Sequence, residues 1–188
     1  MKTTLLIFGC ILTTLAPLLA APLNIVQLGP DEPINVRFET PEGGQSFDLA
    51  HGAASGYFVL PDGEKTLEIK TEGIPDLVVP TGETAHVAVL YQVGEEFLWK
   101  LVESEPLKEK WSFKIVNLTG KPLEITATDG ESVLAADEVR AVAVERKAQI
   151  AVQAAGLEKQ TSDAPEPSQV FALMYLSEGK NKLLFVGR

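Results

Sequence analysis

An internal repeat constrains the fold of this chain more than any other feature of its sequence. The segment KIVNLTGKPLEITATDG, residues 114–130, resembles the earlier segment NIVQLGPDEPINVRFETPEGG, residues 24–44. Matching residues lie 90 positions apart at first, and the offset then falls to 89, 85 and 84 (Ile25 with Ile115, Pro33 with Pro122, Leu49 with Leu134, Tyr91 with Tyr175). Because a second copy that has lost loop residues gives an offset that only shrinks, the pattern predicts a tandem duplication.

The repeat predicts two domains and a linker. The first domain spans residues 22–102 and the second spans residues 111–188. Between them lies the polar segment ESEPLKEK, residues 103–110, in which Pro106 stiffens a linker that has no material for a core. Each copy has about 80 residues, which is enough for one small hydrophobic core.

Apolar residues alternate with polar ones inside each copy, as in a half-buried β-strand. Phe113 and Ile115 alternate with Ser112 and Lys114, and the segment PLEITAT repeats the pattern. Successive strand side chains point to opposite faces, so we expect one face toward a core and one toward water. Turns rich in Gly and Pro separate six to eight short strands per copy, and no segment has a helical period. The sequence therefore predicts an all-β fold of two tandem β-sandwich domains.

The polar segment GLEKQTSDAPEPSQ, residues 156–169, has no counterpart of the same character in the first copy. It contains Pro165 and Pro167 and has little to bury, which predicts a mobile loop. A partner-docking segment is the alternative.

The first 21 residues have the order of a secretory signal peptide. Lys2 precedes an apolar run, and the small residues Ala20 and Ala21 offer two cleavage positions. Pro17 interrupts the run, which is shorter than the roughly 20 residues that span a bilayer. The single cysteine, Cys10, lies inside this segment, so the mature chain has no disulfide. These features predict a periplasmic or extracellular protein with no transmembrane segment after cleavage.

The charge of the chain excludes several classes of partner. The formal net charge is −10 and becomes −11 once Lys2 is removed. Nucleic acid and anionic lipid headgroups would bring further negative charge to this surface at close range. We therefore expect no nucleic acid partner.

Residues of catalytic type are few and scattered. Ser55 in GAASGY has His51 four positions before it, but no glycine stands two positions before the serine and no helix is expected to follow. A small-residue turn before the strand GYFVL is the better interpretation. His86 lies on the strand face opposite Val87 and Val89, which indicates a solvated or hydrogen-bonded histidine. The sequence predicts no catalytic residue and no enzyme.

Metal and cofactor motifs are also lacking. Zinc is disfavoured because the mature chain has no thiolate. Asp129 and Glu131 could contribute to a calcium site in one turn, but the regular calcium loop is missing. No glycine-rich phosphate loop precedes a helix, so we expect no cofactor and no metal. The tripeptide NLT at Asn117 fits a glycosylation acceptor, although a strand that ends in a turn explains it better.

Two tryptophans flank the expected linker. Trp99 alternates in phase with Phe97 and Leu101, and Trp111 alternates in phase with Phe113 and Ile115. Packing in a core or between the domains is the favoured interpretation, and stacking on sugar rings is the alternative. Trp99 and Trp111, at the interdomain region, are the only candidates for a binding site.

The segment LVESEPLKEKWSFKIVNLTGKPLEITATDG, residues 101–130, resembles the AlgF family of periplasmic accessory proteins of alginate O-acetylation. The resemblance implies a signal peptide, two small β-sandwich domains and a proline- and lysine-containing linker. It also implies an exported, non-enzymatic adaptor that binds the protein partners of a polysaccharide acetylation complex, and with them the polysaccharide. The alternative is a periplasmic or surface module for envelope structure or glycan adhesion, similar to the repeated surface domains of the DUF4397 family.

Overall fold

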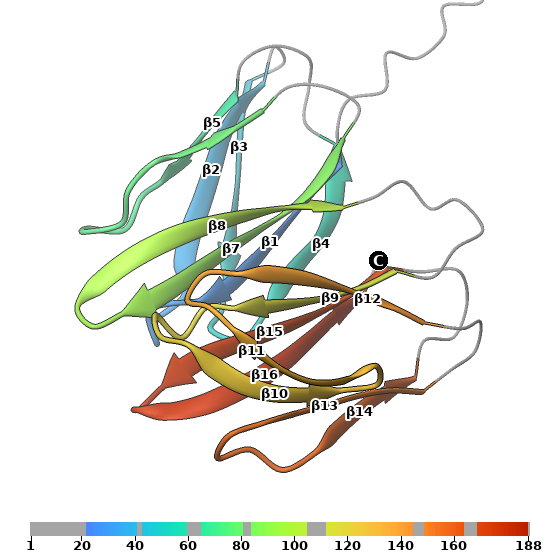
Figure 1. Cartoon of the computed structure of the whole chain (residues 1–188). Coiled ribbons are helices and arrows are strands. Elements are labelled where there is room, and N and C mark those ends of the chain that lie inside the picture. Colours follow the sequence, from blue (N-terminus) through green and yellow to red (C-terminus); the bar gives the residue numbers. More distant parts are fainter. Residues whose placement is uncertain are drawn as a thin grey trace, which may run out of the picture.

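The computed structural model describes residues 22–40, 43–59, 65–80, 84–104, 112–144, 149–163 and 169–187. Within these ranges the fold is all-β, with sixteen strands and no helix (Figure 1). The predicted signal peptide, most of the predicted linker and Trp111 lie outside the described residues. None of the described residues belongs to a helix that is long and apolar enough to cross a membrane.

The first half of the chain forms two four-stranded sheets. The first inner sheet has the order β4-β1-β7-β8, and the first outer sheet has the order β3-β2-β5-β6. The eight strands are β1 (Pro22–Leu28), β2 (Ile34–Thr40), β3 (Gly43–Leu49), β4 (Ala54–Val59), β5 (Lys65–Ile69), β6 (Leu77–Val79), β7 (Ala85–Val93) and β8 (Glu96–Ser104).

The second half repeats this arrangement strand for strand. The second inner sheet has the order β12-β9-β15-β16, and the second outer sheet has the order β11-β10-β13-β14. The strands are β9 (Ser112–Asn117), β10 (Leu123–Ala127), β11 (Gly130–Leu134), β12 (Val139–Ala143), β13 (Gln149–Ala154), β14 (Gln160–Asp163), β15 (Gln169–Ser177) and β16 (Lys180–Gly187). The parallel pair β1–β7 corresponds to the parallel pair β9–β15. The tandem pair of β-sandwiches that the repeat predicts is confirmed.

Each sandwich encloses its own hydrophobic core. The first core lies between the first inner and outer sheets and includes Leu23, Ile34 and Leu67, all with no exposed surface. The second core includes Phe113 and Ile115, which are equally buried. Burying one apolar side chain of this size contributes about 1.5–3 kcal/mol, so each pair of sheets has a core that favours its own sandwich.

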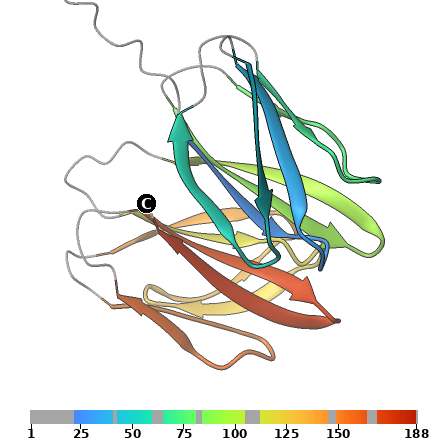
Figure 2. The same ribbon diagram turned by 180° about the vertical axis from the view of Figure 1, so that it is seen from behind.

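A third core joins the two sandwiches. It is called the central core here and combines side chains from β1, β7 and β8 with side chains from β9, β15 and β16. The two inner sheets therefore pack against each other, and the four sheets form a stack in the order outer, inner, inner, outer (Figures 1 and 2). The buried members of the central core are Val26, Leu28, Val87, Val89, Tyr91, Val102, Val116, Leu118, Phe171, Leu173 and Val186.

The central core corrects the expectation that each strand has one face toward water. On β7, Ala88 and Leu90 face the first core while Val87 and Val89 face the central core, and all four are fully buried. Strands β1, β9 and β15 are likewise buried on both sides over most of their length. Strands that are covered on both faces become near-continuous apolar runs, and the alternation is clearest in outer strands such as β10 and β13.

Polar contacts across the central core are arranged reciprocally. The Tyr91 hydroxyl of β7 donates to Asp137 Oδ1 at 3.2 Å, in the turn before β12. Its counterpart on β15, Tyr175, lies with its ring centroid 6.3 Å from that of His51, in the turn before β4. Lys100 Nζ also donates to Asp137 Oδ2 at 2.8 Å. Each half thus contacts the equivalent turn of the other, as the subunits of a two-fold dimer do.

Two predicted segments are corrected by the strand boundaries. The segment 156–169 was expected to be a loop, yet residues 160–163 form β14, which pairs with β13 along its edge. An edge strand needs backbone hydrogen bonds on one side only, so polar residues such as Thr161 and Ser162 can form it without a core. At the other site, Glu103 and Ser104 of the expected linker are the last residues of β8.

Candidate functional site

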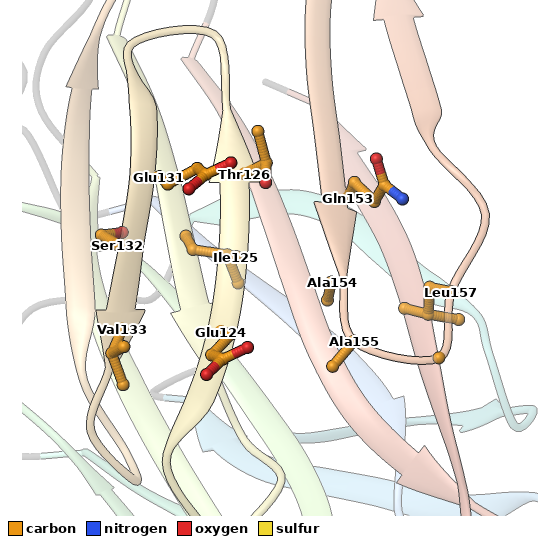
Figure 3. A pocket seen from close by; sticks show the side chains of 11 residues that line it. Glu124, Ile125, Thr126, Glu131, Ser132, Val133, Gln153, Ala154, Ala155 and Leu157 are labelled. Carbon is orange, nitrogen blue, oxygen red and sulfur yellow. The ribbon is translucent and has the colours of Figure 1, made fainter.

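A hollow of about 700 Å³ lies on the second outer sheet. This groove is bounded by the β10–β11 hairpin on one side and by β13 with its following turn on the other (Figure 3). Its volume falls within the range of roughly 300–1,000 Å³ that is common for ligand sites. The groove is lined by Glu124, Ile125, Thr126, Glu131, Ser132, Val133, Gln153, Ala154, Ala155, Gly156 and Leu157.

The pairing of β10 with its two neighbours brings polar side chains into the groove. Thr126 is opposite Glu131 on β11 and opposite Gln153 on β13, so the three side chains share one face of the sheet. Glu124 lies two residues before Thr126 and therefore on the same face, opposite Val133. Figure 3 shows Glu131, Thr126 and Gln153 around one end of the groove and Glu124 toward the other.

The polar side chains of the groove differ in whether they form hydrogen bonds within the protein. Ser132 accepts a hydrogen bond from the Arg140 guanidinium, which also forms an ion pair with Asp129 at 2.7 Å. In the described part of the chain, the side chains of Glu124, Thr126, Glu131 and Gln153 form no hydrogen bond or ion pair. The groove thus presents two carboxylates, a hydroxyl and an amide that are free to meet a ligand.

Ser55 and His51 are held by backbone groups of the first sandwich. Ser55 is the second residue of β4, where its Oγ accepts a hydrogen bond from the Ile25 amide at 2.9 Å and donates to the Gly56 carbonyl at 2.8 Å. These bonds fill the irregularity in the β1–β4 ladder between Asn24 and Val26. His51 lies within 3.2 Å of the Pro30 carbonyl through its Nδ1. The turn is shorter than expected, because only residues 51 and 52 form it and Ala54 and Ser55 already belong to β4.

His86 is not solvated, which was one of the two alternatives that the sequence left open. It is buried, with only 5% of its surface exposed, and its Nδ1 has no hydrogen-bond partner within the described residues. This burial lowers the pKa of His86, while the carboxylate of Glu103 and the backbone of Thr84 raise it to a smaller extent. The solvated alternative is wrong because β7 is covered on both faces, whereas the hydrogen-bonded alternative agrees with the contact to the Thr84 backbone.

The two tryptophan candidates have different outcomes. Trp99 packs against the first core together with Phe97 and Leu101, as the period of the strand predicts. Its Nε1 donates to the Pro75 carbonyl at 2.9 Å, so the ring is held over the first sandwich and away from the central core. Trp111 lies outside the described residues, and a binding role for either tryptophan stays a prediction.

Asn117 is a structural residue and not an exposed glycosylation acceptor. It ends β9, has no exposed surface, and its Oδ1 accepts hydrogen bonds from the amide and the hydroxyl of Thr119 at 3.1 and 2.7 Å. Its Nδ2 lies within hydrogen-bond distance of the carbonyls of Lys121, Leu134 and Ala135. The expected strand that ends in a turn is confirmed.

The two carboxylates considered for calcium, Asp129 and Glu131, have different surroundings. Asp129 is bound to Arg140, while Glu131 lines the groove. Among the described residues, no group of three or more His, Cys, Asp or Glu side chains could hold a metal ion.

Of the residues that line the groove, only Glu131 was singled out from the sequence, and then as a calcium candidate. Glu124 and Thr126 belong to the alternating segment PLEITAT, where they were assigned to a water-facing strand surface. That assignment describes their exposure correctly, but exposed polar residues on a strand have the same pattern whether or not they surround a hollow. Only the placement of β11 and of residues 155–157 beside them reveals the groove.

Comparisons with known proteins give no family. No family model matches the chain, and no curated protein matches it. One similar solved structure is described as "a putative cell adhesion protein from Bacteroides uniformis ATCC 8492". It shares 7% sequence identity over 89% of this chain and 96% of that chain, with a TM-score of 0.22, a likeness too distant to carry an argument about function.

Proposed function

We propose that this chain is an exported, non-catalytic adaptor of the bacterial envelope that serves the O-acetylation of an extracellular polysaccharide. The sequence resemblance over residues 101–130 suggests the process, and the predicted signal peptide suggests a periplasmic or extracellular location. The central core supports the adaptor role most directly, because it holds two sandwiches as one body with two separate outer sheets. Such a body can hold partners in a fixed relation without any chemistry of its own.

The engagement of hydroxyl and imidazole groups also supports a role without catalysis. Ser55 hydrogen-bonds to two backbone groups, His51 lies beside a carbonyl, and His86 is buried in strand β7. A nucleophilic serine needs a base within hydrogen-bond reach of its hydroxyl. Ser55 instead forms hydrogen bonds with Ile25, Asn24 and Gly56.

The charge of the chain favours contact with the acetylation machinery over direct contact with an acidic polysaccharide. The net charge is −10, and the groove on the second outer sheet adds Glu124 and Glu131 to its lining. A polyuronate would meet like charge at this surface, which weakens binding. We therefore place the adaptor against protein partners, with no cofactor. A glycan-adhesion module has less support, since no aromatic ring lines the groove.

A deletion strain tests this function. Its extracellular polysaccharide should lose O-acetyl groups, measured by ¹H NMR of the purified polymer, and the wild-type gene should restore them. Ser55→Ala, His51→Gln and His86→Val should also restore acetylation, provided that immunoblots show the protein at wild-type levels. An unchanged acetyl content in the deletion strain would overturn the proposal. A Ser55→Ala protein that accumulates normally but restores nothing would indicate an enzyme.

A further inference from the structure

The outer sheets of the two sandwiches can be compared position by position. Alignment of their ladders makes Asn35, Arg37, Ser46, Asp48 and Glu68 of the first outer sheet equivalent to Glu124, Thr126, Glu131, Val133 and Gln153 of the second. The offsets, 89 for β2 and 85 for β3 and β5, agree with those of the sequence repeat. The two faces are therefore the same surface with different side chains.

The first outer face pairs some of its polar residues across the ladder. Asn35 Nδ2 donates to Asp48 Oδ1 at 2.7 Å, directly across the β2–β3 ladder. Arg37 stands opposite Glu68 on β5, which places a cation beside that carboxylate. This face thus has one cross-strand hydrogen bond between side chains and a cation opposite a carboxylate.

The second outer face has neither that hydrogen bond nor a cation. Val133 stands where Asp48 does and gives Glu124 no hydrogen-bond partner, and Thr126 replaces the cation Arg37. Glu131 replaces a serine and adds a second carboxylate to the same face. The lining of the groove therefore contains two carboxylates and no lysine or arginine.

The remaining lining narrows the class of ligand. Val133 is 62% exposed, and Leu157 and Ala155 add further apolar surface at the same end of the groove as Glu124 (Figure 3). Lysine and arginine side chains combine an apolar stem with a cationic head, so they match carboxylates that lie beside aliphatic groups. A neutral sugar commonly needs an aromatic ring on which to stack, and the lining residues include none.

We propose that the groove on the second outer sheet binds an extended, lysine- or arginine-bearing segment of a protein partner. Glu124 and Glu131 pair with the cationic groups, Thr126 and Gln153 hydrogen-bond to the backbone or polar groups of the segment, and Val133 and Leu157 contact its aliphatic stems. The inference deepens the proposed adaptor function by naming where the adaptor holds its partner. The groove itself is tested without that partner.

The test uses the mature chain and two synthetic peptides. Amide chemical shifts of the ¹⁵N-labelled protein are followed during titration with acetyl-KVKVKV-amide, and separately with acetyl-EVEVEV-amide. The basic peptide should shift the amides of β10, β11 and β13 specifically, and the acidic peptide should shift none of them. Glu124→Gln together with Glu131→Gln should weaken the basic peptide about tenfold, since two exposed ion pairs are lost. Glu96→Gln, an exposed carboxylate at the β7–β8 turn, is the control with a matched type of charge change and should bind as wild type.

Three results would overturn the inference. The basic peptide could shift amides evenly over the acidic surface, or the double variant could bind it as tightly as the wild-type protein does. A neutral oligosaccharide such as cellohexaose could shift the groove amides while the basic peptide does not, which would make the groove a glycan site. A failed peptide titration leaves the acetylation test of the deletion strain unaffected, so the two proposals fail separately.

Discussion

The first and second sandwiches differ in how the buried polar side chain near the end of their first strand is hydrogen-bonded. Gln27 on β1 and Asn117 on β9 occupy equivalent positions, and both have no exposed surface. Their backbones make the same bonds, because the Gln27 amide donates to the Ala53 carbonyl and the Asn117 amide donates to the Glu138 carbonyl. The Asn117 side chain is satisfied at both of its polar atoms, whereas Gln27 Oε1 has no partner among the described residues.

This difference separates the features that both halves share from those that vary between them. Backbone pairing, strand order and the positions of the turns recur in both halves, since every strand depends on them. Side chains vary wherever the backbone does not depend on them, as in the two outer faces and in these buried polar residues. The halves also meet through faces of their own inner sheets, so each depends on the other. The predictions below test how far the equivalence extends.

The largest effect is expected from the central core. Phe171 lies there and Phe113 lies in the second core, and both have no exposed surface. Phe171→Ala and Phe113→Ala should each lower the free energy of unfolding by about 3–5 kcal/mol, because both leave a cavity in a packed interior. Urea unfolding measures both values. A loss below about 1 kcal/mol for Phe171→Ala would mean that the halves are not packed against each other.

The buried polar residues should differ in their cost. Asn117→Ala leaves carbonyls of Lys121, Leu134 and Ala135 without their donor, so we expect a loss of about 3 kcal/mol. Gln27→Ala should cost about 1 kcal/mol, because it leaves the carbonyls of Pro30 and Glu32 without their donor but also removes an acceptor that is already unpaired. Chemical denaturation of both variants gives the comparison. Equal losses would show that the unpaired oxygen of Gln27 does not lower the free energy of unfolding of the wild-type protein.

Two glycines provide a matched test of the contact between the halves. Gly120 and Gly156 both have a positive φ, +74° and +79°, but a Cβ at Gly120 would lie 2.5 Å from Val93 Cγ1 while a Cβ at Gly156 meets nothing within 4 Å. Gly156→Ala should cost about 1 kcal/mol from backbone strain alone, and Gly120→Ala about 2 kcal/mol. Adding Val93→Ala should recover part of the Gly120→Ala loss. If the effects of the two substitutions simply add, Val93 does not contact residue 120.

Alkaline pH tests the reciprocal tyrosines. Burial, followed by the nearby Asp137, raises the pKa of Tyr91 to about 12. The folded state therefore holds the proton more tightly than the unfolded state, whose pKa is about 10, and stability should fall between about pH 10 and 12. Tyr91→Phe should cost about 1 kcal/mol at pH 7 and reduce this fall. Thermal melts across the range measure it. An unchanged alkaline fall in Tyr91→Phe would assign the effect elsewhere.

Acid pH gives the smallest expected effect. The pKa of His86 is lowered by burial, so its folded form resists protonation, and stability should decline as the pH falls below about 6.5 toward the lowered value. Ladder pairing makes Val170 the equivalent residue of the second half. His86→Val should change stability at pH 7 by less than about 1 kcal/mol and reduce the decline between pH 7 and 5. A decline of the same size in the variant would contradict the assignment to His86.

The sequence predicts the features that depend on local pattern. The alternation in residues 123–127 and the glycine turns are local, and they place the strands and the duplication correctly. Double burial of the inner strands depends on contact between residues far apart in the chain. Apolar runs such as VFALM in β15 carry a signal for burial on both faces, but an exposed apolar face and a buried one have the same letters. For the same reason the sequence could not decide between a solvated and a buried, hydrogen-bonded His86.

The groove could not be predicted from the pattern either. Its residues come from three strands and a turn, and the feature that distinguishes them is the lack of an internal partner, which depends on register. Glu124 and Asn35 are equivalent in the repeat, yet only the ladder shows that Asn35 meets Asp48 while Glu124 meets Val133. A register shift of one residue would move these side chains to the other face of the sheet.

The number of unfolding transitions tests the central core most directly. Differential scanning calorimetry of residues 22–188 should show one transition whose calorimetric and van't Hoff enthalpies agree for the whole molecule, because neither sandwich can lose its fold without exposing the inner face of the other. Two separable transitions, one for each sandwich, would contradict the account and make the halves independent domains.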